Sequence, residues 1–379
     1  MKFFYIFPAL VHMVSSFRVV IVGGGPAGLL SGIAAASRGF EVSIFEKKEK
    51  PNKDNRSFNF IVSERGLNVL EKFDIDLKDS IGIKNIVSHF PGDESMSIDA
   101  PRSVSMDRND LLKAMSKKLK TFNVFTEKSE FEAADFGQKI AYFSHGSERY
   151  DLLIGADGSS SSVREHLSLE FPQDMNIYQK MDDKLYKNVK LDPFGLAYLR
   201  GYNSDWDNSF HIWKSENADL ICPPTKENGL TGVFVNSDGF FNPDDFKEFF
   251  SVMYTEDEME FQRSHPRRQK TVYSSSIGMK STVLVGESAH SVLASLGQGL
   301  PASLESVSVL DYCFGLEKGN ICDNYNRLRL NDAHSVCKLS QMGFGGSDRT
   351  NRGKASGVLK YLNDPSLSYS EILKFMEKN

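Results

Sequence analysis

The first clear pattern of hydrophobic positions is a strand–turn–helix–strand unit at residues 18–46. Arg18–Val22 is a β-branched run of the kind that forms a strand buried on both faces. After a glycine-rich turn, Ala27–Ser37 is small and apolar, which suits a helix that packs closely on a sheet. Gly39 is expected to end that helix, and Glu41–Phe45 is expected to form the second strand. The pattern predicts the beginning of a parallel α/β sheet.

Apolar residues at helical spacing mark several later segments. The expected helices are Ser63–Phe73 with Ser63 as its cap, Met106–Lys120 from about Asp107, Pro243–Tyr254, Leu300–Leu316, Asn320–Leu339 and an amphipathic Pro365–Asn379. Strand-like runs lie between them. These are Ser57–Val62, which also suits the start of a helix, Val124–Phe143 as strand–turn–strand, Tyr150–Asp157 and Val283–Gly286.

The pattern changes between residues 188 and 235, where short alternating runs are separated by turn residues. These runs are Gly195–Arg200, Ser209–Trp213, Asp219–Cys222 and Thr231–Val235. They predict an antiparallel sheet, which we interpret as one wall of a substrate chamber.

Composition and charge narrow the class of protein. The chain has 379 residues, 40% hydrophobic and 25% charged, which allows two domains or one large domain with an inserted sheet. Its net charge of −5 gives no reason to expect a nucleic-acid partner. The four cysteines show neither CxxC nor metal-type spacing, so we expect no disulfide framework and no metal site.

The N-terminus differs from the rest of the chain. One lysine precedes an apolar run from Phe3 to Leu10 that continues to Val14, and Ser15 and Ser16 follow. This arrangement resembles a signal peptide and is too short for a membrane span. Residues 1–16 are therefore predicted to direct the chain to the secretory pathway or an organelle, for example a plastid. The other interpretation is an extension that packs on a cytoplasmic protein. No C-terminal membrane anchor is expected, and the sequence does not predict an oligomeric state.

The turn inside the first unit carries the first chemical motif. Gly23, Gly25 and Gly28 form G-x-G-x-x-G, with Ala27 at the start of the helix. Glycines in this pattern allow a tight turn and let the backbone approach a pyrophosphate at the positive end of the helix. Glu46, at the end of the second strand, supplies the acid expected to bind an adenosine ribose. The unit therefore predicts a dinucleotide site.

A second motif follows the predicted strand at 150–157. The sequence from Asp151 to Arg164 reads DLLIGADGSSSSVR, in which Asp157 and Gly158 form a turn of the phosphate-binding type. Asp157 is expected to order the turn and to orient donors, and Arg164 is expected to supply positive charge. The alternative is a capped turn that leads into a helix beginning near Ser160.

The third motif lies in the sequence from Val283 to Ser306. A predicted buried strand ends at Gly286, Glu287 follows, and Gly297 and Gly299 flank a loop before a helix. An acid at the carboxyl end of a strand lies where ligands bind in open α/β sheets. The helix start after Gly299 is expected to place its positive end near a bound ligand.

These three motifs, in this order, resemble the class A FAD-dependent aromatic hydroxylases. The resemblance covers about Val19 to Leu339 and is strongest toward the kynurenine 3-monooxygenases. The stretches that carry it are Arg56–Asn59, Ser63 with Arg65 and Gly66, Ser105–Leu111, His211–Trp213, Gly286–His290 and Asn324–Ser340.

The resemblance implies an α/β fold with a Rossmann-like FAD-binding domain of the para-hydroxybenzoate hydroxylase type. An antiparallel-sheet substrate domain is interleaved with it, and helices follow at the C-terminus. On this division residues 17–86, 106–175 and 276–342 form the FAD-binding domain. Residues 87–105 and 176–275 form the substrate domain, and residues 343–379 form a variable tail.

The resemblance also implies the chemistry. FAD would be the bound cofactor and NADPH or NADH a transient reductant, and a flavin C4a-hydroperoxide would hydroxylate a small aromatic substrate. Arg108 would lie beside the pyrophosphate and ribityl chain, Asp157 would serve the FAD and nicotinamide steps, and Glu287 would bind the ribityl chain. The predicted cofactor-binding residues are Gly23, Gly25, Ala27, Gly28, Glu46, Lys47, Arg56, Arg108, Asp157, Gly158, Arg164, Gly286, Glu287, Gly297, Gly299 and Leu300.

The chain departs from the family pattern on the side where the chemistry would occur. Glu287 replaces an aspartate, and Pro301 replaces an asparagine and thereby removes a backbone N–H. The family's carboxylate-binding arginine falls at Ile86, and its tyrosine falls at Arg102, which becomes the candidate substrate contact. A pocket asparagine falls near Gly343. No catalytic side chain is predicted, because the hydroxylation would rest on the flavin.

Two other functions fit the same motifs. One is a non-hydroxylating FAD oxidoreductase or epoxidase of this fold; a halogenase is disfavoured because Trp206 and Trp213 are the only tryptophans. The other is a degenerate flavin-binding protein without activity. A long apolar channel would indicate the epoxidase, and weak FAD binding would indicate the degenerate protein.

Overall fold

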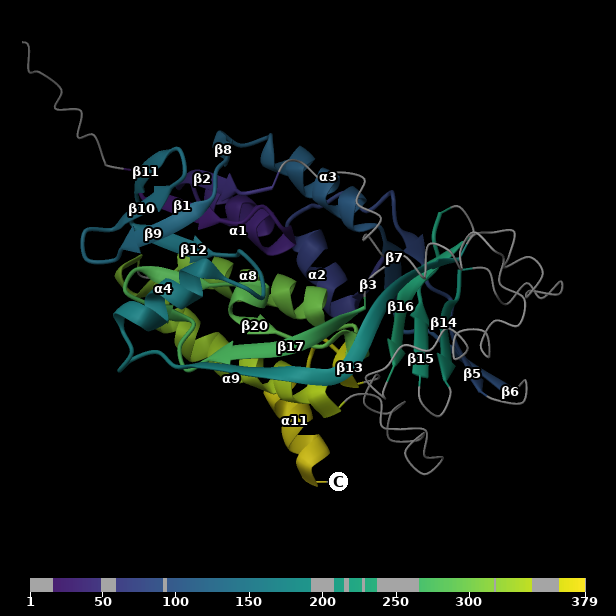
Figure 1. The fold of residues 1–379 in the computed structure, drawn as a ribbon. Helices are drawn as coiled ribbons and strands as arrows, with labels where there is room; N and C mark the ends of the chain where they lie inside the picture. The colour runs from purple at the N-terminus through teal and green to yellow at the C-terminus, as the bar shows by residue number, and fades with distance from the viewer. Residues whose placement is uncertain are drawn as a thin grey trace, which may run out of the picture.

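The computed structural model describes residues 16–48, 59–90, 94–191, 208–214, 218–226, 229–236, 266–316, 318–342 and 361–378. Within them, a six-stranded sheet and an eight-stranded sheet are the largest elements (Figure 1). Two smaller three-stranded sheets accompany them. The predicted mixed α/β class is confirmed.

The secondary structure of the described residues is as follows. The strands are β1 (Arg18–Val22), β2 (Glu41–Glu46), β3 (Phe60–Ser63), β4 (Ile81–Gly82), β5 (Asn85–Phe90), β6 (Glu94–Asp99), β7 (Ser103–Met106), β8 (Val124–Lys128), β9 (Phe131–Asp135), β10 (Ile140–Phe143), β11 (Gly146–Arg149), β12 (Leu152–Gly155), β13 (Ile177–Leu191), β14 (Phe210–Lys214), β15 (Ala218–Cys222), β16 (Leu230–Asn236), β17 (Arg267–Ser274), β18 (Gly278–Met279), β19 (Thr282–Leu284) and β20 (His290–Ser291). The α-helices are α1 (Pro26–Ser37), α2 (Glu64–Lys72), α3 (Arg108–Leu119), α4 (Ser162–Glu170), α8 (Gly299–Phe314), α9 (Ile321–Met342) and α11 (Tyr369–Lys378), and the 3₁₀ turns are η2 (Gly286–Ser288), η3 (Ala294–Leu296) and η4 (Lys318–Asn320).

The six-stranded sheet has the order β18-β19-β12-β1-β2-β8, and β1 pairs in parallel with β2 and β12. Helix α1 covers one face of this sheet at β1 and β2, and it also packs against α3 and α8. The β9–β11 sheet covers the opposite face, where Phe45 stacks on Phe143 with ring centroids 3.9 Å apart. Because both faces are covered, the β-branched run of β1 is buried, as its sequence predicts.

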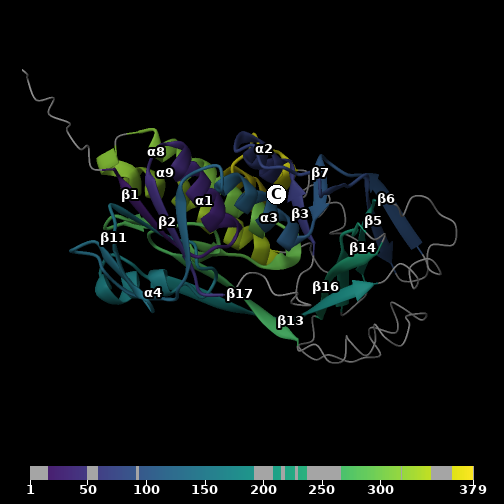
Figure 2. The same ribbon diagram turned by 90° about the horizontal axis from the view of Figure 1, so that it is seen from above.

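The eight-stranded sheet has the order β20-β17-β13-β16-β15-β14-β5-β6. The long strand β13 connects the two parts of the molecule, and β5, β6 and β14 lie at the end opposite to β1 and β2 (Figure 2). The predicted runs at 209–213, 219–222 and 231–235 become β14, β15 and β16, so this part of the predicted sheet is confirmed. The predicted strand Gly195–Arg200 and helix Pro243–Tyr254 lie outside the described residues.

Helix starts follow the sequence closely. Asp107 caps α3, and its carboxylate accepts hydrogen bonds from the backbone N–H groups of Asn109 at 2.7 Å and Asp110 at 3.3 Å. Ser63 occupies the N-cap position of α2 as predicted, but its hydroxyl makes no capping bond. The prediction of strand–turn–strand over Val124–Phe143 was too simple, because the chain leaves the parallel sheet after β8 and begins a separate antiparallel sheet with β9 and β10.

The C-terminal residues 361–378 pack against the body of the protein. Helix α11 lies beside α9, in the yellow part of Figure 1. Leu362 and Tyr369 are fully buried in a hydrophobic cluster that also contains Leu296 and Ala302. The predicted amphipathic helix near the C-terminus is present as α11, and its apolar face has a partner surface. Within the described part of the chain, no helix combines the length and apolar character needed to cross a membrane.

Asp311 on α8 ties three helices together. Its carboxylate pairs with Arg38, just after α1, at 3.0 Å and with Lys72, at the end of α2, at 2.8 Å. Burial alone would raise the pKa of Asp311, but the hydrogen bonds from Arg38 and Lys72 bring that pKa below its usual value. The pairs therefore stabilise the fold above the unfolded-state pKa, and the contribution is lost as pH falls through the folded-state pKa.

Asp311→Asn is expected to lower the free energy of unfolding by about 1 kcal/mol at neutral pH, since both cations are partly exposed and screened. Below the folded-state pKa the wild type and the variant should be equally stable. Urea titrations of both proteins across acidic pH measure this, with Asp323→Asn on the exposed first turn of α9 as the control. An equal loss at neutral and acidic pH would contradict the role of the charge.

Candidate functional site

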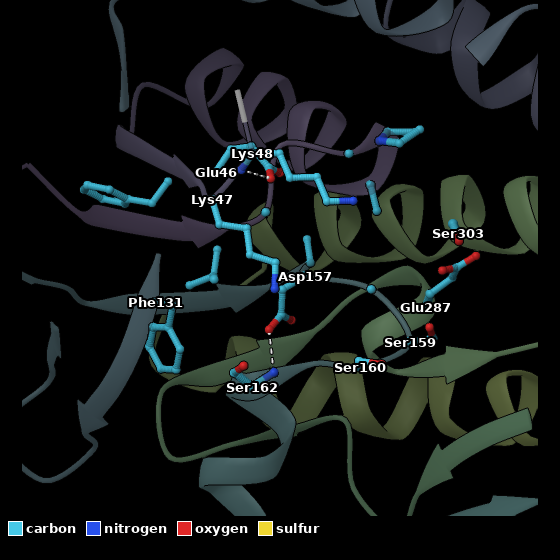
Figure 3. A pocket seen from close by; sticks show the side chains of 18 of the residues that line it. Glu46, Lys47, Lys48, Phe131, Asp157, Ser159, Ser160, Ser162, Glu287 and Ser303 are labelled. Atoms are coloured by element: carbon cyan, nitrogen blue, oxygen red, sulfur yellow. Dashed lines mark hydrogen bonds between the residues drawn. The ribbon is translucent and has the colours of Figure 1, made fainter. Parts of the chain in front are cut away.

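A cavity lies at the carboxyl edge of the six-stranded sheet, where β1, β2 and β12 end and where α1 and α8 begin (Figure 3). This edge is where ligands bind in open α/β folds. Its lining residues are Val22, Gly23, Gly25, Pro26, Ala27, Phe45, Glu46, Lys47, Lys48, Phe60, Arg108, Ser129, Glu130, Phe131, Ala156, Asp157, Gly158, Ser159, Ser160, Ser162, Glu287, Gly299, Leu300 and Ser303.

The glycine turn between β1 and α1 forms the middle of the cavity. Gly23 has a φ of +107°, and a Cβ there would lie 2.4 Å from the carbonyl oxygen of Ala156. A Cβ on Gly28 would lie 1.9 Å from the carbonyl oxygen of Gly23, whereas one on Gly25 would meet nothing within 4 Å. Gly23 and Gly28 are therefore required for packing, and Gly25 leaves open space where α1 begins. The backbone N–H groups of that helix start can bind a phosphate.

Glu46 is held rigidly at one end of the cavity. Its Oε2 accepts a hydrogen bond from the backbone N–H of Gly24 at 2.7 Å, and its Oε1 accepts one from the backbone N–H of Lys48 at 2.9 Å. Each carboxylate oxygen retains a second lone pair for a hydroxyl donor. The Lys47 side chain lies on the same wall and forms an ion pair with Glu130 at 3.7 Å.

Asp157 lines the cavity, and its carboxylate also contacts the first turn of the following helix, α4. Its Oδ2 accepts from the backbone N–H groups of Ser162 at 2.8 Å and Val163 at 3.2 Å, so it helps to cap α4 (Figure 3). Burial raises the pKa of Asp157, opposed by these hydrogen bonds. The capped turn, which is the alternative interpretation of this motif, is present, with the helix beginning at Ser162. Gly158, with a φ of +86°, lines the cavity beside it.

Arg164 has a different place from the one predicted. Its guanidinium is buried and donates to the carbonyl oxygens of Ser288 at 2.8 Å and Ser159 at 2.8 Å. It is not among the residues that line the described cavity. Arg164 therefore connects the turn after β12 to the turn after β19, and it orders the cavity wall from behind. We correct its predicted direct contact with the cofactor accordingly.

Glu287, Arg108 and Ser303 form the other end of the cavity. The Glu287 side chain lines the cavity, points toward Ser303 and is exposed there (Figure 3). Desolvation by the surrounding protein atoms raises the pKa of Glu287, and the nearby positive charge of Arg108 opposes the shift. An acid in this position, just after β19, can accept hydrogen bonds from hydroxyl groups.

The first turn of α8 closes this end. Gly299 and Leu300, two of the predicted cofactor-binding residues, line the cavity, and the Ser303 hydroxyl donates to the carbonyl oxygen of Gly299 at 2.7 Å. Pro301 is buried behind them. The predicted glycines Gly286 and Gly297 do not line the cavity; they shape it through backbone conformations with φ values of +66° and +64°.

Arg102 does not approach the cavity. It lies just before β7, and its guanidinium forms ion pairs with Glu71 and Glu64 and a hydrogen bond with Asn68 at 3.0 Å, all on α2. Arg102 therefore does not line the described cavity, and its contact with a substrate stays a prediction. Arg56 lies outside the described residues.

The structure adds residues that the sequence did not identify. Phe45, Ser129, Glu130 and Phe131 line the Glu46 end, and Ser303 lines the other. Residues 129–131 reach the cavity because β8 pairs with β2 at the edge of the sheet. No local signal predicts that pairing.

The cavity fits an extended dinucleotide. A fixed acid lies at one end, the open helix start beside Gly25 in the middle, and a second acid with Arg108 at the other end. These are the groups that ribose hydroxyls, a pyrophosphate and a ribityl chain require.

Comparison with known proteins agrees with this geometry. Residues 16–192 match the family model of an FAD binding domain. Kynurenine 3-monooxygenase from Phaeosphaeria nodorum is 28% identical over 373 residues, covering 85% of this chain and 76% of that protein. The enzyme of the same name from Candida albicans is 26% identical over 367 residues, covering 86% of this chain and 79% of that protein.

This chain is a relative of the FAD-dependent aromatic hydroxylases. The resemblance inferred from the three motifs is thus confirmed, and so is the prediction of an enzyme of the flavin-dependent monooxygenase type. Residues 16–192 carry the FAD-binding domain.

Solved structures support the fold. A tetrameric form of 2-methyl-3-hydroxypyridine-5-carboxylic acid oxygenase matches with a TM-score of 0.74 at 19% identity, covering 90% of this chain and 93% of that one. The p-nitrophenol 4-monooxygenase from Pseudomonas putida matches with a TM-score of 0.73 at 16% identity, covering 96% and 98%. The predicted hydroxylase-type fold is confirmed.

Proposed function

We propose that this protein is an FAD-dependent monooxygenase that uses NADPH or NADH and O2 to hydroxylate a small aromatic substrate related to kynurenine. The observation that carries the proposal is the cavity with Glu46 and Glu287 at its two ends and the glycine turn between them. The similarity to kynurenine 3-monooxygenases supports the substrate class.

In this proposal each part of the cavity binds one part of FAD. Glu46 accepts hydrogen bonds from the adenosine ribose, and the start of α1 binds the pyrophosphate. Arg108 lies beside the pyrophosphate and ribityl chain, and Glu287 accepts hydrogen bonds from the ribityl hydroxyls. The start of α8 directs its positive end toward the flavin ring. Bound FAD would supply the oxygen transfer, for which the resemblance implies a C4a-hydroperoxide.

The test uses the purified full-length chain. We expect a flavin absorption spectrum, NADPH or NADH oxidation that an aromatic substrate stimulates, and a product that gains one oxygen atom by mass spectrometry. Kynurenine and a panel of small phenols and anilines are the substrates. Bound FAD without any oxygenated product would contradict the hydroxylase and indicate a non-hydroxylating flavoprotein, and the lack of FAD binding would contradict both.

Glu287→Gln tests the ribityl end of the site. An ionised carboxylate accepts hydrogen bonds more strongly than a protonated one. Because desolvation raises the pKa of Glu287, FAD affinity of the wild type should increase as pH rises through that pKa. The variant should bind FAD about tenfold more weakly at neutral pH and lose this pH dependence.

Flavin fluorescence titrations between acidic and neutral pH measure both effects. Glu132→Gln, which removes an exposed acid on β9 that does not line the cavity, is the control. An unchanged pH dependence in Glu287→Gln would show that this carboxylate does not bind the cofactor.

A further inference from the structure

A side chain from the C-terminal helix reaches the loop at the flavin end of the cavity. Tyr369, the first residue of α11, is fully buried, and its hydroxyl donates to Oε1 of Gln298 at 2.9 Å. Gln298 is itself buried, and its Nε2 donates to the carbonyl oxygen of Leu296 at 3.2 Å. Gln298 immediately precedes Gly299, which lines the cavity. One tyrosine thus connects the end of the chain to the cofactor site.

The position of this loop depends on the C-terminal segment. Leu296 and Ala302, on either side of Gln298, are buried in a cluster whose other members come from α9 and residues 361–378, namely Val336, Leu339, Leu362, Tyr369, Ile372 and Leu373. The chain reverses within the loop at Gly297, which has a φ of +64°. Without α11, the outer side of the loop would lose most of this apolar support.

Arg65 packs against one face of the Tyr369 ring and holds it in place. The guanidinium of Arg65 lies 4.7 Å from the ring centroid, a cation–π distance. Its Nε donates to the carbonyl oxygen of Leu362 at 2.7 Å, and its Nη1 pairs with Glu305 on α8 at 2.7 Å. The hydroxyl of Tyr369 is therefore aimed at Gln298 by a buried ionic framework.

The placement of Gly299 and Leu300 matters because Pro301 has no N–H. The first hydrogen bond inside α8 is donated by Ala302 to the carbonyl oxygen of Gln298 at 3.0 Å. Gly299 and Leu300 line the cavity, and a helix leaves the N–H groups of its first residues without an acceptor inside the helix. Pro301 leaves this helix start with one N–H donor fewer than usual. Each remaining donor therefore contributes a larger share of the stabilisation of a bound anionic group, and a small shift of the loop has a larger effect on it.

We propose that Tyr369 is a positioning residue that acts through Gln298 to fix Gly299 and Leu300 against the flavin. The docked C-terminal helix thereby sets the environment of the cofactor, although α11 does not line the cavity. This inference rests on the proposed function, since it requires FAD in the cavity.

The test compares Tyr369→Phe with Tyr361→Phe in the full-length chain. Both remove one hydroxyl from the C-terminal segment, but Tyr361 packs against Phe375 with ring centroids 4.9 Å apart and does not contact Gln298 through a described hydrogen bond. Tyr369→Phe keeps the ring over Arg65. It should raise the FAD dissociation constant two- to tenfold, as expected for one buried hydrogen bond.

Three readouts separate positioning from a merely structural role. The visible circular dichroism of the FAD-saturated protein should change in Tyr369→Phe. A larger fraction of the NADPH or NADH oxidation should reduce O2 to hydrogen peroxide and leave the substrate unhydroxylated. Gln298→Ala should change the same readouts in the same direction, and adding Tyr369→Phe to it should change nothing further, because the Tyr369 hydroxyl acts through Gln298. Tyr361→Phe should match the wild type in every readout.

Two outcomes are distinguishable. If the wild type binds FAD and Tyr369→Phe matches it in FAD affinity, flavin circular dichroism and peroxide fraction, the positioning role is wrong and the proposed function stands. If the wild type binds no FAD, the proposed function itself fails, and this inference fails with it.

Discussion

Gly28→Ala is expected to abolish FAD binding and to destabilise the whole FAD-binding domain. The added Cβ would lie 1.9 Å from the carbonyl oxygen of Gly23 and 3.0 Å from its carbonyl carbon. Both are backbone atoms, and Gly23 is itself held by a hydrogen bond from its N–H to the carbonyl oxygen of Phe45 at 2.8 Å. Neither side of the contact can yield by rotating a side chain. We expect a loss of at least about 3 kcal/mol in the free energy of unfolding.

Gly25→Ala separates cofactor binding from packing in the same turn. A Cβ at Gly25 would meet nothing within 4 Å, and Gly25 lines the cavity. This variant should fold with nearly wild-type stability but bind FAD more weakly than the wild type, because the methyl group would occupy space beside the helix start where the pyrophosphate is expected.

Urea denaturation and FAD fluorescence titration measure the two effects separately. Gly82→Ala on β4, where a Cβ also meets nothing and which does not line the cavity, is the control for both. Wild-type stability in Gly28→Ala would show that the turn adopts another geometry. Wild-type FAD affinity in Gly25→Ala would show that the pyrophosphate does not bind at the start of α1.

Arg329→Met is expected to produce the second large effect, on stability. Arg329 on α9 is almost fully buried, and its Nη2 donates to the carbonyl oxygen of Ala302 at 2.8 Å. Its Nε donates to the Ser306 hydroxyl at 3.0 Å, and its Nη1 lies 3.5 Å from both Glu305 and Asp332. Methionine preserves most of the volume but removes every one of these bonds.

Removing one partner of a buried ionic network typically costs about 3–5 kcal/mol. We expect the lower end of that range, because Glu305 keeps its ion pair with Arg65 at 2.7 Å. Arg327→Met is the matched control, since Arg327 is exposed on the same helix and bonds only to Asn324 at 3.2 Å among the described contacts. It should change the free energy of unfolding by less than about 0.5 kcal/mol.

Urea titrations of the three proteins, followed by far-ultraviolet circular dichroism, give the free energies. A loss below about 1 kcal/mol in Arg329→Met would contradict a stabilising role for the buried network and would fit the view that such networks mainly specify geometry. The family-like stretch Asn324–Ser340 would then need another explanation.

Local patterns in the sequence were sufficient for the cofactor half of the site. The run Arg18–Val22, the glycine turn and Glu46 lie within one continuous segment, so their geometry follows from strand, turn and helix rules alone. The same holds for the Asp107 cap of α3 and for the turn at Asp157, where short-range hydrogen bonds decide the conformation. The elements that these local interactions predict, including the Asp107 cap and the turn at Asp157, are present in the structure.

Residues far apart in the sequence decided the rest, because their roles depend on which strands and helices become neighbours. The predicted roles of Arg102 and Arg164 rest on charge and position. In the structure, the Arg102 guanidinium pairs with Glu71 on α2, and the Arg164 guanidinium donates to the carbonyl oxygen of Ser288 after β19. Charge alone does not predict which partner satisfies an arginine. Ser129–Phe131 reach the cavity only because β8 pairs with β2.

The sequence by itself determined the βαβ unit, the dinucleotide chemistry and the family resemblance, since all three depend on short motifs with fixed spacing. Only the tertiary structure showed that the last helix packs on the loop before α8 and that Tyr369 meets Gln298 across a separation of 71 residues. The physical reason is that an amphipathic pattern such as that of α11 predicts that one face of the helix packs on an apolar surface, but it does not identify that surface.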